Sequence, residues 1–190
     1  MPRRLAATFL ICLVPLAAHA DGTVDKLITK ADRIRLEKYG ESRRKAIAEA
    51  KAGGDPQFAE TEKLLAKPLK PFSGLDMTGA WKCRTVKLGG LLPFVDYPWF
   101  KCRVTDDGSG WMLSKLTGSQ RTTGRFYDDG DKRLIYLGSF SVNEDRPKPY
   151  GSGPETDQVG YAFRTGPKEW RIEFPAPAYE STLDILEFQR

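Results

Sequence analysis

The chain has 190 residues and a formal net charge of +5 at pH 7, from 30 Lys and Arg against 25 Asp and Glu. That length predicts one domain with some additions, and the small positive excess does not predict a nucleic-acid partner. The one histidine is His19, so residues 20–190 have no imidazole for a Ser-His-Asp triad, a Cys-His pair or a metal site.

Residues 1–20 have the pattern of an export signal. Two arginines precede an apolar run over residues 5–17, and the small-x-small triplet at 18–20 is typical of a cleavage site. The run is shorter than the roughly 20 apolar residues that cross a bilayer, so no transmembrane span is predicted. We expect an exported protein, periplasmic or secreted, that begins at Asp21; an uncleaved anchor is the alternative. Loss of two arginines would leave 28 basic against 25 acidic residues, or +3.

Residues 21–77 are predicted to form a helical N-terminal segment and linker. Thr29 with Asp32 resembles a capping box at a helix start. Gly53-Gly54 predicts the end of this helix, and Asp55-Pro56 the start of a shorter one. The prolines at 68 and 71 predict its end.

Residues 78–190 are predicted to form an antiparallel β domain, because short aromatic and β-branched runs alternate there with turns. The expected strands lie near 79–88, 95–105, 110–117, 120–127, 132–142, 158–165, 169–174 and 182–189. Eight such strands predict a lipocalin-like barrel or a two-sheet sandwich. The Asp-Asp-Gly triplets at 106–108 and 128–130 are hairpin turn signals. The second continues into Asp131 but lacks the ligand spacing of a calcium loop, so no metal site and no cofactor is predicted.

Cys83 and Cys102 are the two cysteines outside the predicted signal. Cysteines of an exported chain usually pair, and closing a loop of this size stabilises a fold by about 3 kcal/mol. A free thiol pair and a redox-active pair are the alternatives, although the spacing is unlike Cys-x-x-Cys. We expect a structural disulfide.

The two cysteines lie in similar phrases, Trp-Lys-Cys-Arg and Phe-Lys-Cys-Arg, which suggest a hairpin register. With Cys83 opposite Cys102, Lys82 faces Arg103 and Arg84 faces Lys101. Side-chain alternation then puts the four cations on the outer face, with Tyr97 and Trp99 nearby. Opposed like charges need solvent, carboxylates or an anionic partner. A solvated face is the plainer interpretation; the sharper one is a patch for an anionic envelope polymer, a lipid head group or an acidic protein.

Two further segments are candidates for binding. Ser119, Gln120 and Arg121 form a polar turn between two predicted strands, which either contacts a ligand or is a plain hairpin with its arginine packed across the barrel end. The Pro- and Gly-rich segment 143–157 has the length of a binding flap, or is simply a mobile loop.

Six motifs together resemble the family called domain of unknown function 4893, a family of exported bacterial proteins. In chain order they are Thr29 to Leu36, Gly79 to Arg84, Tyr97 to Arg103, Leu116 to Gly124, Tyr136 to Gly138 and Leu183 to Glu187. The resemblance covers nearly the whole chain after the signal and implies export, but no activity. Gly79-Ala80-Trp81 also resembles the Gly-x-Trp opening of lipocalin-like barrels, where an arginine packs on the tryptophan. Arg171, Arg190 and Arg121 are candidates for that role.

Three functions are compatible with these features. The leading hypothesis is a non-enzymatic periplasmic binding or interaction protein, with its ligand in the barrel mouth or on the basic hairpin. The second is a protease-inhibitor-like barrel, for which the helical N-terminal segment is a poor match. The third is a hydrolase that works without histidine, through Asp, Glu, Lys or Tyr.

Overall fold

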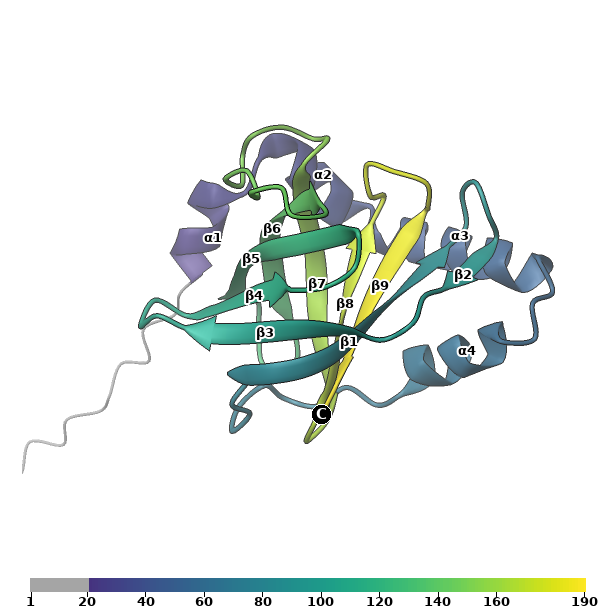
Figure 1. Ribbon diagram of the computed structural model, residues 1–190, viewed down its shortest axis with the longest axis horizontal. Coiled ribbons are helices and arrows are strands. Elements are labelled where there is room, and N and C mark those ends of the chain that lie inside the picture. The colour runs from purple at the N-terminus through teal and green to yellow at the C-terminus, as the bar shows by residue number, and fades with distance from the viewer. Residues whose placement is uncertain (1–20) are drawn as a thin grey trace, which may run out of the picture.

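The computed structural model describes residues 21–190, and the predicted signal at 1–20 lies outside these residues. Four helices come first, and nine strands follow (Figure 1). The helices are α1 (Asp21–Leu27), α2 (Lys30–Glu37), α3 (Tyr39–Ala52) and α4 (Phe58–Ala66). The strands are β1 (Gly79–Leu88), β2 (Phe94–Asp96), β3 (Phe100–Asp106), β4 (Trp111–Lys115), β5 (Gln120–Asp128), β6 (Leu134–Val142), β7 (Asp157–Gly166), β8 (Glu169–Pro175) and β9 (Leu183–Gln189).

The strands confirm a mainly β fold and select the barrel over the sandwich. All neighbours pair antiparallel, in the order β2-β1-β3-β4-β5-β6-β7-β8-β9, and β1 also pairs with β9. This last pairing closes eight strands into an up-and-down barrel with β2 as an extra strand. Closure leaves few unpaired strand edges for other chains to add to. No helix among residues 21–190 is long and apolar enough to cross a membrane.

The strand predicted over 95–105 is two strands in the structure. Pro98 lies between β2 and β3, and proline cannot donate a ladder hydrogen bond. One edge of β1 therefore pairs with β3 over its first half and with β2 over its second half. As a result, the strand beside β1 changes from β3 to β2 halfway along β1.

The structure contains the predicted disulfide between Cys83 and Cys102, with 5.9 Å between their Cα atoms. The predicted register, however, is wrong by two residues. Cys83 pairs with Phe100 and Cys102 with Trp81, so the disulfide joins the strands diagonally. A shift of two residues keeps every side chain on its predicted face, because side chains alternate with period two. It changes the opposed pairs: Lys82 faces Lys101 directly.

Large side chains fill the closed end of the barrel. Trp170 stacks on Phe188 with 3.5 Å between ring centroids, and Trp81 meets Trp170 edge-on. Trp81 donates its indole N–H to Met77 O at 2.7 Å, and the Arg190 guanidinium lies 4.0 Å from its ring centroid. Arg190 is thus the one of the three candidate arginines that packs on Trp81.

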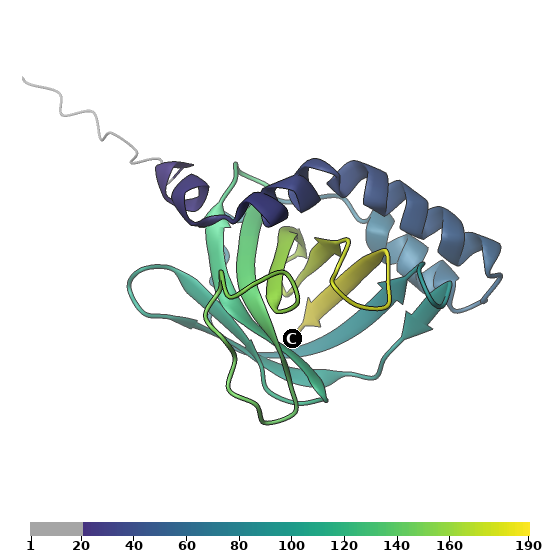
Figure 2. The ribbon, with the colours of Figure 1, turned by 90° about the horizontal axis from the view of Figure 1, so that it is seen from above.

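The helices form an arm along the outside of the barrel (Figure 2). The Thr29 side chain caps α2 by accepting the Asp32 N–H, as predicted. Helix α4 begins later than predicted, at Phe58, and Asp55 instead accepts the Gln57 N–H in the preceding turn. Apolar residues of α3 and α4 cover outward residues of β1 and β9, and the buried members of this second core are Ala46, Ala50, Phe58, Leu64, Val86, Leu88, Leu183 and Ile185.

A buried carboxylate fixes α3 to β8. The Glu173 side chain is fully buried on the outer face of β8 and accepts hydrogen bonds from Arg171 at 2.7 Å, Arg43 at 2.9 Å and the Tyr39 hydroxyl at 2.7 Å. Burial and the neighbouring Glu173 charge raise the pKa of Tyr39. Two guanidinium groups and one hydroxyl therefore offset the cost of burying the Glu173 carboxylate away from water.

Candidate functional site

The predicted basic hairpin has three exposed cations rather than four. Arg84 is bonded to Asp96 and to Glu187, each at 2.7 Å, and Trp99 lies over its guanidinium. Its charge is therefore compensated. Lys82, Lys101 and Arg103 are exposed on the outer face, and the described residues give none of the three an ion-pair partner.

Residues of the predicted polar turn lie apart from these cations. Gln120 accepts a hydrogen bond from Lys87 Nζ at 3.0 Å, whereas Arg121 bonds to Glu144 and to Gly118 O. Ser119, the first residue of the turn, is exposed. Gln120 thus points to a different part of the molecule, the open end of the barrel.

We call this open end the mouth; the connections at 89–93, 116–119, 143–156 and 176–182 surround it. Strand alternation places charged residues inside it. On β1, Lys87 continues the inward series of Trp81 and Cys83; on β4, Lys115 follows inward Leu113; on β9, Asp184 precedes inward Leu186. The aromatic interior therefore becomes polar toward the mouth.

Lys115 is the most unusual of these groups. Its side chain is buried, its Nζ donates to Gln120 O at 2.7 Å, and it lies 4.4 Å from the Phe100 ring centroid. Within residues 21–190 it has no carboxylate at ion-pair distance, unlike Lys87, which pairs with Glu180. Desolvation, with the nearby Lys87 charge, lowers the pKa of Lys115 to about 8.

Two acceptors complement this donor. Asp184 accepts from the Ser181 hydroxyl, and desolvation raises its pKa to about 6. The amide oxygen of Gln158 is buried and accepts no hydrogen bond from the described residues. A buried acceptor without a donor is costly, so this oxygen favours a bound group that carries a hydroxyl or N–H.

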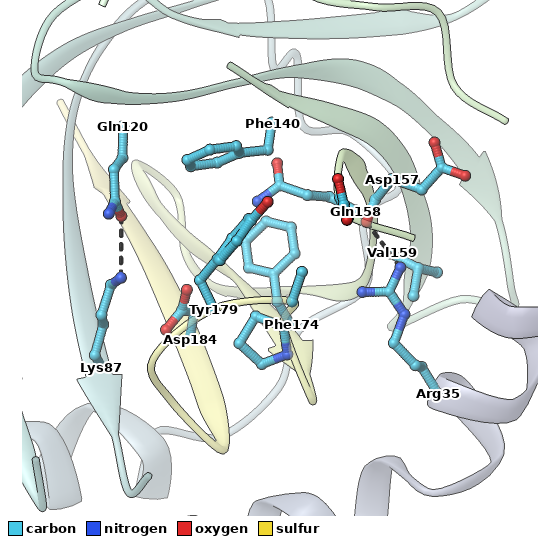
Figure 3. Close-up of a pocket in the computed structure, with 13 residues that line it drawn as sticks. Arg35, Lys87, Gln120, Phe140, Asp157, Gln158, Val159, Phe174, Tyr179 and Asp184 are labelled. Carbon is cyan, nitrogen blue, oxygen red and sulfur yellow. Dashed lines mark hydrogen bonds between the residues drawn. The ribbon is translucent and has the colours of Figure 1, made fainter. Parts of the chain in front are cut away.

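Lys115, Asp184, Gln158 and Gln120 line a single cavity of about 50 Å³. Adjoining spaces of about 20 and 70 Å³ extend it toward the arm and toward Tyr97. A water needs about 10–15 Å³, so the mouth admits a small head group rather than a large ligand. Figure 3 shows Lys87 and Gln120 at one side, with Gln158 across the mouth.

The arm and the segment 143–157 fix one side of the mouth. Tyr150 donates its hydroxyl to Asp32 at 2.6 Å, and Arg35 donates to Asp157 O at 2.8 Å. The Asp157 carboxylate accepts backbone N–H groups of the loop, at Gly151, Ser152 and Gly153. The predicted flap is thus tied to the barrel and to the arm.

Sequence reasoning reached part of this site and missed its charged centre. It selected Tyr97 and Gln120, which the fold brings to the same space beside Lys115. It gave no role to Lys87, Lys115, Gln158 and Asp184. A signal was present: a charged residue at an inward position of the strand alternation, as for Lys115 after Leu113. Residues 21–190 bring together no cluster of acidic and cysteine side chains that could hold a metal ion.

Comparison with known proteins identifies a family. No curated protein and no solved structure matches the chain. The family model described as domain of unknown function DUF4893 matches residues 25–188, which include nearly all of the arm and the barrel and every residue named at the mouth. The chain therefore belongs to the DUF4893 family.

Proposed function

We propose that this chain is an exported, non-enzymatic binding protein that takes an acidic head group into the mouth of its barrel. The observation that carries the proposal is the Lys115 ammonium, enclosed in a cavity without a carboxylate at ion-pair distance among residues 21–190. Export rests on the N-terminal pattern, and the disulfide is compatible with an oxidising compartment.

Electrostatics favours an acidic ligand. Burying an ammonium that no carboxylate contacts is costly, and a ligand carboxylate or phosphate would offset that cost by a charge-assisted hydrogen bond. Gln158 adds a preference for a ligand that also carries a donor, because its amide oxygen accepts no hydrogen bond from the described residues. An acid that also carries a hydroxyl meets both, as in the acidic sugars of anionic envelope polymers.

Binding of small acids tests the proposal. Inorganic phosphate and galacturonate are titrated against the protein by calorimetry, with neutral galactose as comparison. We expect the acids to bind and galactose to bind more weakly. Lys115→Met, which replaces a buried cation with an apolar side chain of similar length, should weaken acid binding about 10- to 100-fold.

Lys132→Met is the matched control, because Lys132 is exposed at the opposite end of the barrel. It should bind like the parent protein. Equal binding by Lys115→Met and the parent, or no binding of any acid, would contradict the proposal.

The outer face of the hairpin is a second candidate for anion binding. Lys82 and Lys101 face each other directly, and an anion between them would relieve their repulsion. The double variant Lys101→Glu with Arg103→Glu should lose binding to extracts of anionic envelope material. Undiminished binding would leave these residues as a solvated face.

A hydrolase without histidine is the third candidate. Lys115 and Asp184 line one cavity and have pKa values of about 8 and 6, so each exchanges a proton near neutral pH. Turnover of an activated ester that both Lys115→Met and Asp184→Asn abolish would support it. The protease-inhibitor hypothesis gains nothing from the arm, which is helical and packed on the barrel.

A further inference from the structure

A groove at the rim of the mouth is apolar and exposed. Leu91 is 79% exposed and Leu92 is 60% exposed, in the connection between β1 and β2. With Val95 and Tyr97 they line a space of about 260 Å³, which we call the rim groove; Lys87 and Glu180 form its inner side. It is larger than any of the three spaces of the mouth described above.

The connection that holds these leucines is fixed in place. Leu91 N donates to Glu180 O at 2.8 Å, and Gly90 N donates to the Glu49 carboxylate of the arm at 3.1 Å. Figure 1 shows this connection beside the one between β8 and β9. Hydrogen bonds therefore hold the backbone of this connection in place, and the two leucine side chains project from it into solvent.

Shared lining residues link the rim groove to the site of Lys115. Tyr97 lines both the rim groove and the neighbouring space of about 70 Å³. Lys115, Gln120 and Thr85 line that space and also the cavity of the mouth. Tyr97 and Phe100 line the intervening space at the point where the partner of β1 changes from β3 to β2.

We propose that the ligand is a single-chain amphiphile, whose acidic head group lies beside Lys115 and whose apolar chain lies in the rim groove. This inference rests on the proposed function and names its ligand class. A small acid would use the mouth and leave the leucines in water. An acid with an alkyl chain would use the ammonium, the path past Tyr97 and the exposed leucines at once, and each methylene buried would raise affinity up to about fourfold.

A chain-length series tests the inference. Butyrate, octanoate, decanoate and dodecanoate are titrated as monomers, below the concentrations at which they form micelles. We expect affinity to rise with length until the groove is filled. Decyl maltoside, with a neutral head, should bind at least tenfold more weakly than decanoate.

Variants separate the groove from the head-group site. Leu91→Ser with Leu92→Ser should bind butyrate like the parent and lose the gain from octanoate to dodecanoate. Both leucines are exposed, so the variant should fold. Leu69→Ser, an exposed leucine of the linker, is the control and should keep the full series.

Each other outcome overturns the inference in a distinct way. Equal affinity for butyrate and dodecanoate would overturn the groove and leave the acid-binding function standing. No binding of any acid would overturn both. Equal binding of decyl maltoside and decanoate would show that the head group is not selected. Binding to vesicles of phosphatidylglycerol without binding of monomeric dodecanoate would identify a membrane surface instead.

Discussion

At the scale of single residues, the mouth holds two opposite charges that do not form an ion pair. Lys115 and Asp184 line the same cavity, and desolvation shifts the pKa of each toward neutrality. If Lys115 and Asp184 served only to stabilise the fold, we would expect them to contact each other, or apolar residues to stand in their place. Charged groups held apart in a cavity are a feature of binding and catalytic sites.

Asp184 should make the protein more stable as the pH falls from 7 toward 5. Its pKa is about 6 in the folded chain against 3.8 unfolded, so the folded state binds more protons in this window. The free energy of unfolding then falls as the pH rises through 6. Asp184→Asn removes this contribution. Urea unfolding at pH 5, 6 and 7 should therefore show the parent gaining stability relative to Asp184→Asn at low pH; a constant difference between the two would contradict it.

Whether a residue of the site could be predicted depended on its local signal. Gln120 lies in a polar turn and Tyr97 lies in an aromatic hairpin, and both kinds of segment can be recognised as candidate sites from the sequence alone. Asp184 stands in Leu-Asp-Ile-Leu-Glu-Phe, and β9 is buried on both faces, so no alternation marks the inward side. Lys87 points inward because its neighbours Val86 and Leu88 point outward, where the arm covers them. Only the tertiary fold defines these directions.

At the scale of elements, the buried Glu173 joins α3 to β8. Replacing it with glutamine leaves Arg171 and Arg43 close together without a counter-charge, which typically costs about 3–5 kcal/mol. Glu173→Gln should therefore lower the free energy of unfolding by this amount in urea titration. Tyr39→Phe removes one hydrogen bond of the cluster and should cost about 1–3 kcal/mol. A smaller loss for Glu173→Gln than for Tyr39→Phe would contradict this ranking.

The disulfide links β1 and β3 across a separation of 19 residues. The paired variant Cys83→Ala with Cys102→Ala should lower the free energy of unfolding by about 3 kcal/mol, because the unfolded chain loses a closed loop. Circular dichroism should still show the β fold, since eight pairings of the sheet do not depend on the link. Unchanged stability would mean that the bond does not form in the folded protein.

Strand positions could be predicted here and strand partners less well. Turn residues and alternation place a strand from local sequence, as for β1, whose bounds match the prediction. Register depends on contacts between strands: two cysteines opposite each other and two cysteines on a diagonal satisfy the same pattern. The division at Pro98, and with it the change of partner along β1, had a local signal, whereas the closure of β1 with β9 had none, because it joins the first and last strands of the β domain.

At the scale of the whole molecule, the arm and the barrel pack together through a common apolar core. Val86, Leu88, Leu183 and Ile185 point out of the barrel, and the arm covers them together with Phe94 of β2. The arm also bonds to the loop at the mouth through Asp32 and Arg35. The motif from Thr29 to Leu36 thus attaches the arm to the mouth of the barrel.

Removing the arm should therefore unfold the barrel. A chain of residues 78–190 would expose the outward apolar faces of β1 and β9, and the Arg171–Glu173 pair would lose Arg43 and Tyr39 of the arm. We expect it to aggregate or to bind a hydrophobic dye with no cooperative thermal transition. A chain of residues 28–190 loses only α1 and should keep a cooperative transition at a lower temperature. If 78–190 instead melts cooperatively and still binds acids, the arm is an addition to a self-sufficient barrel, and its contacts to Tyr150 and Asp157 do not shape the mouth.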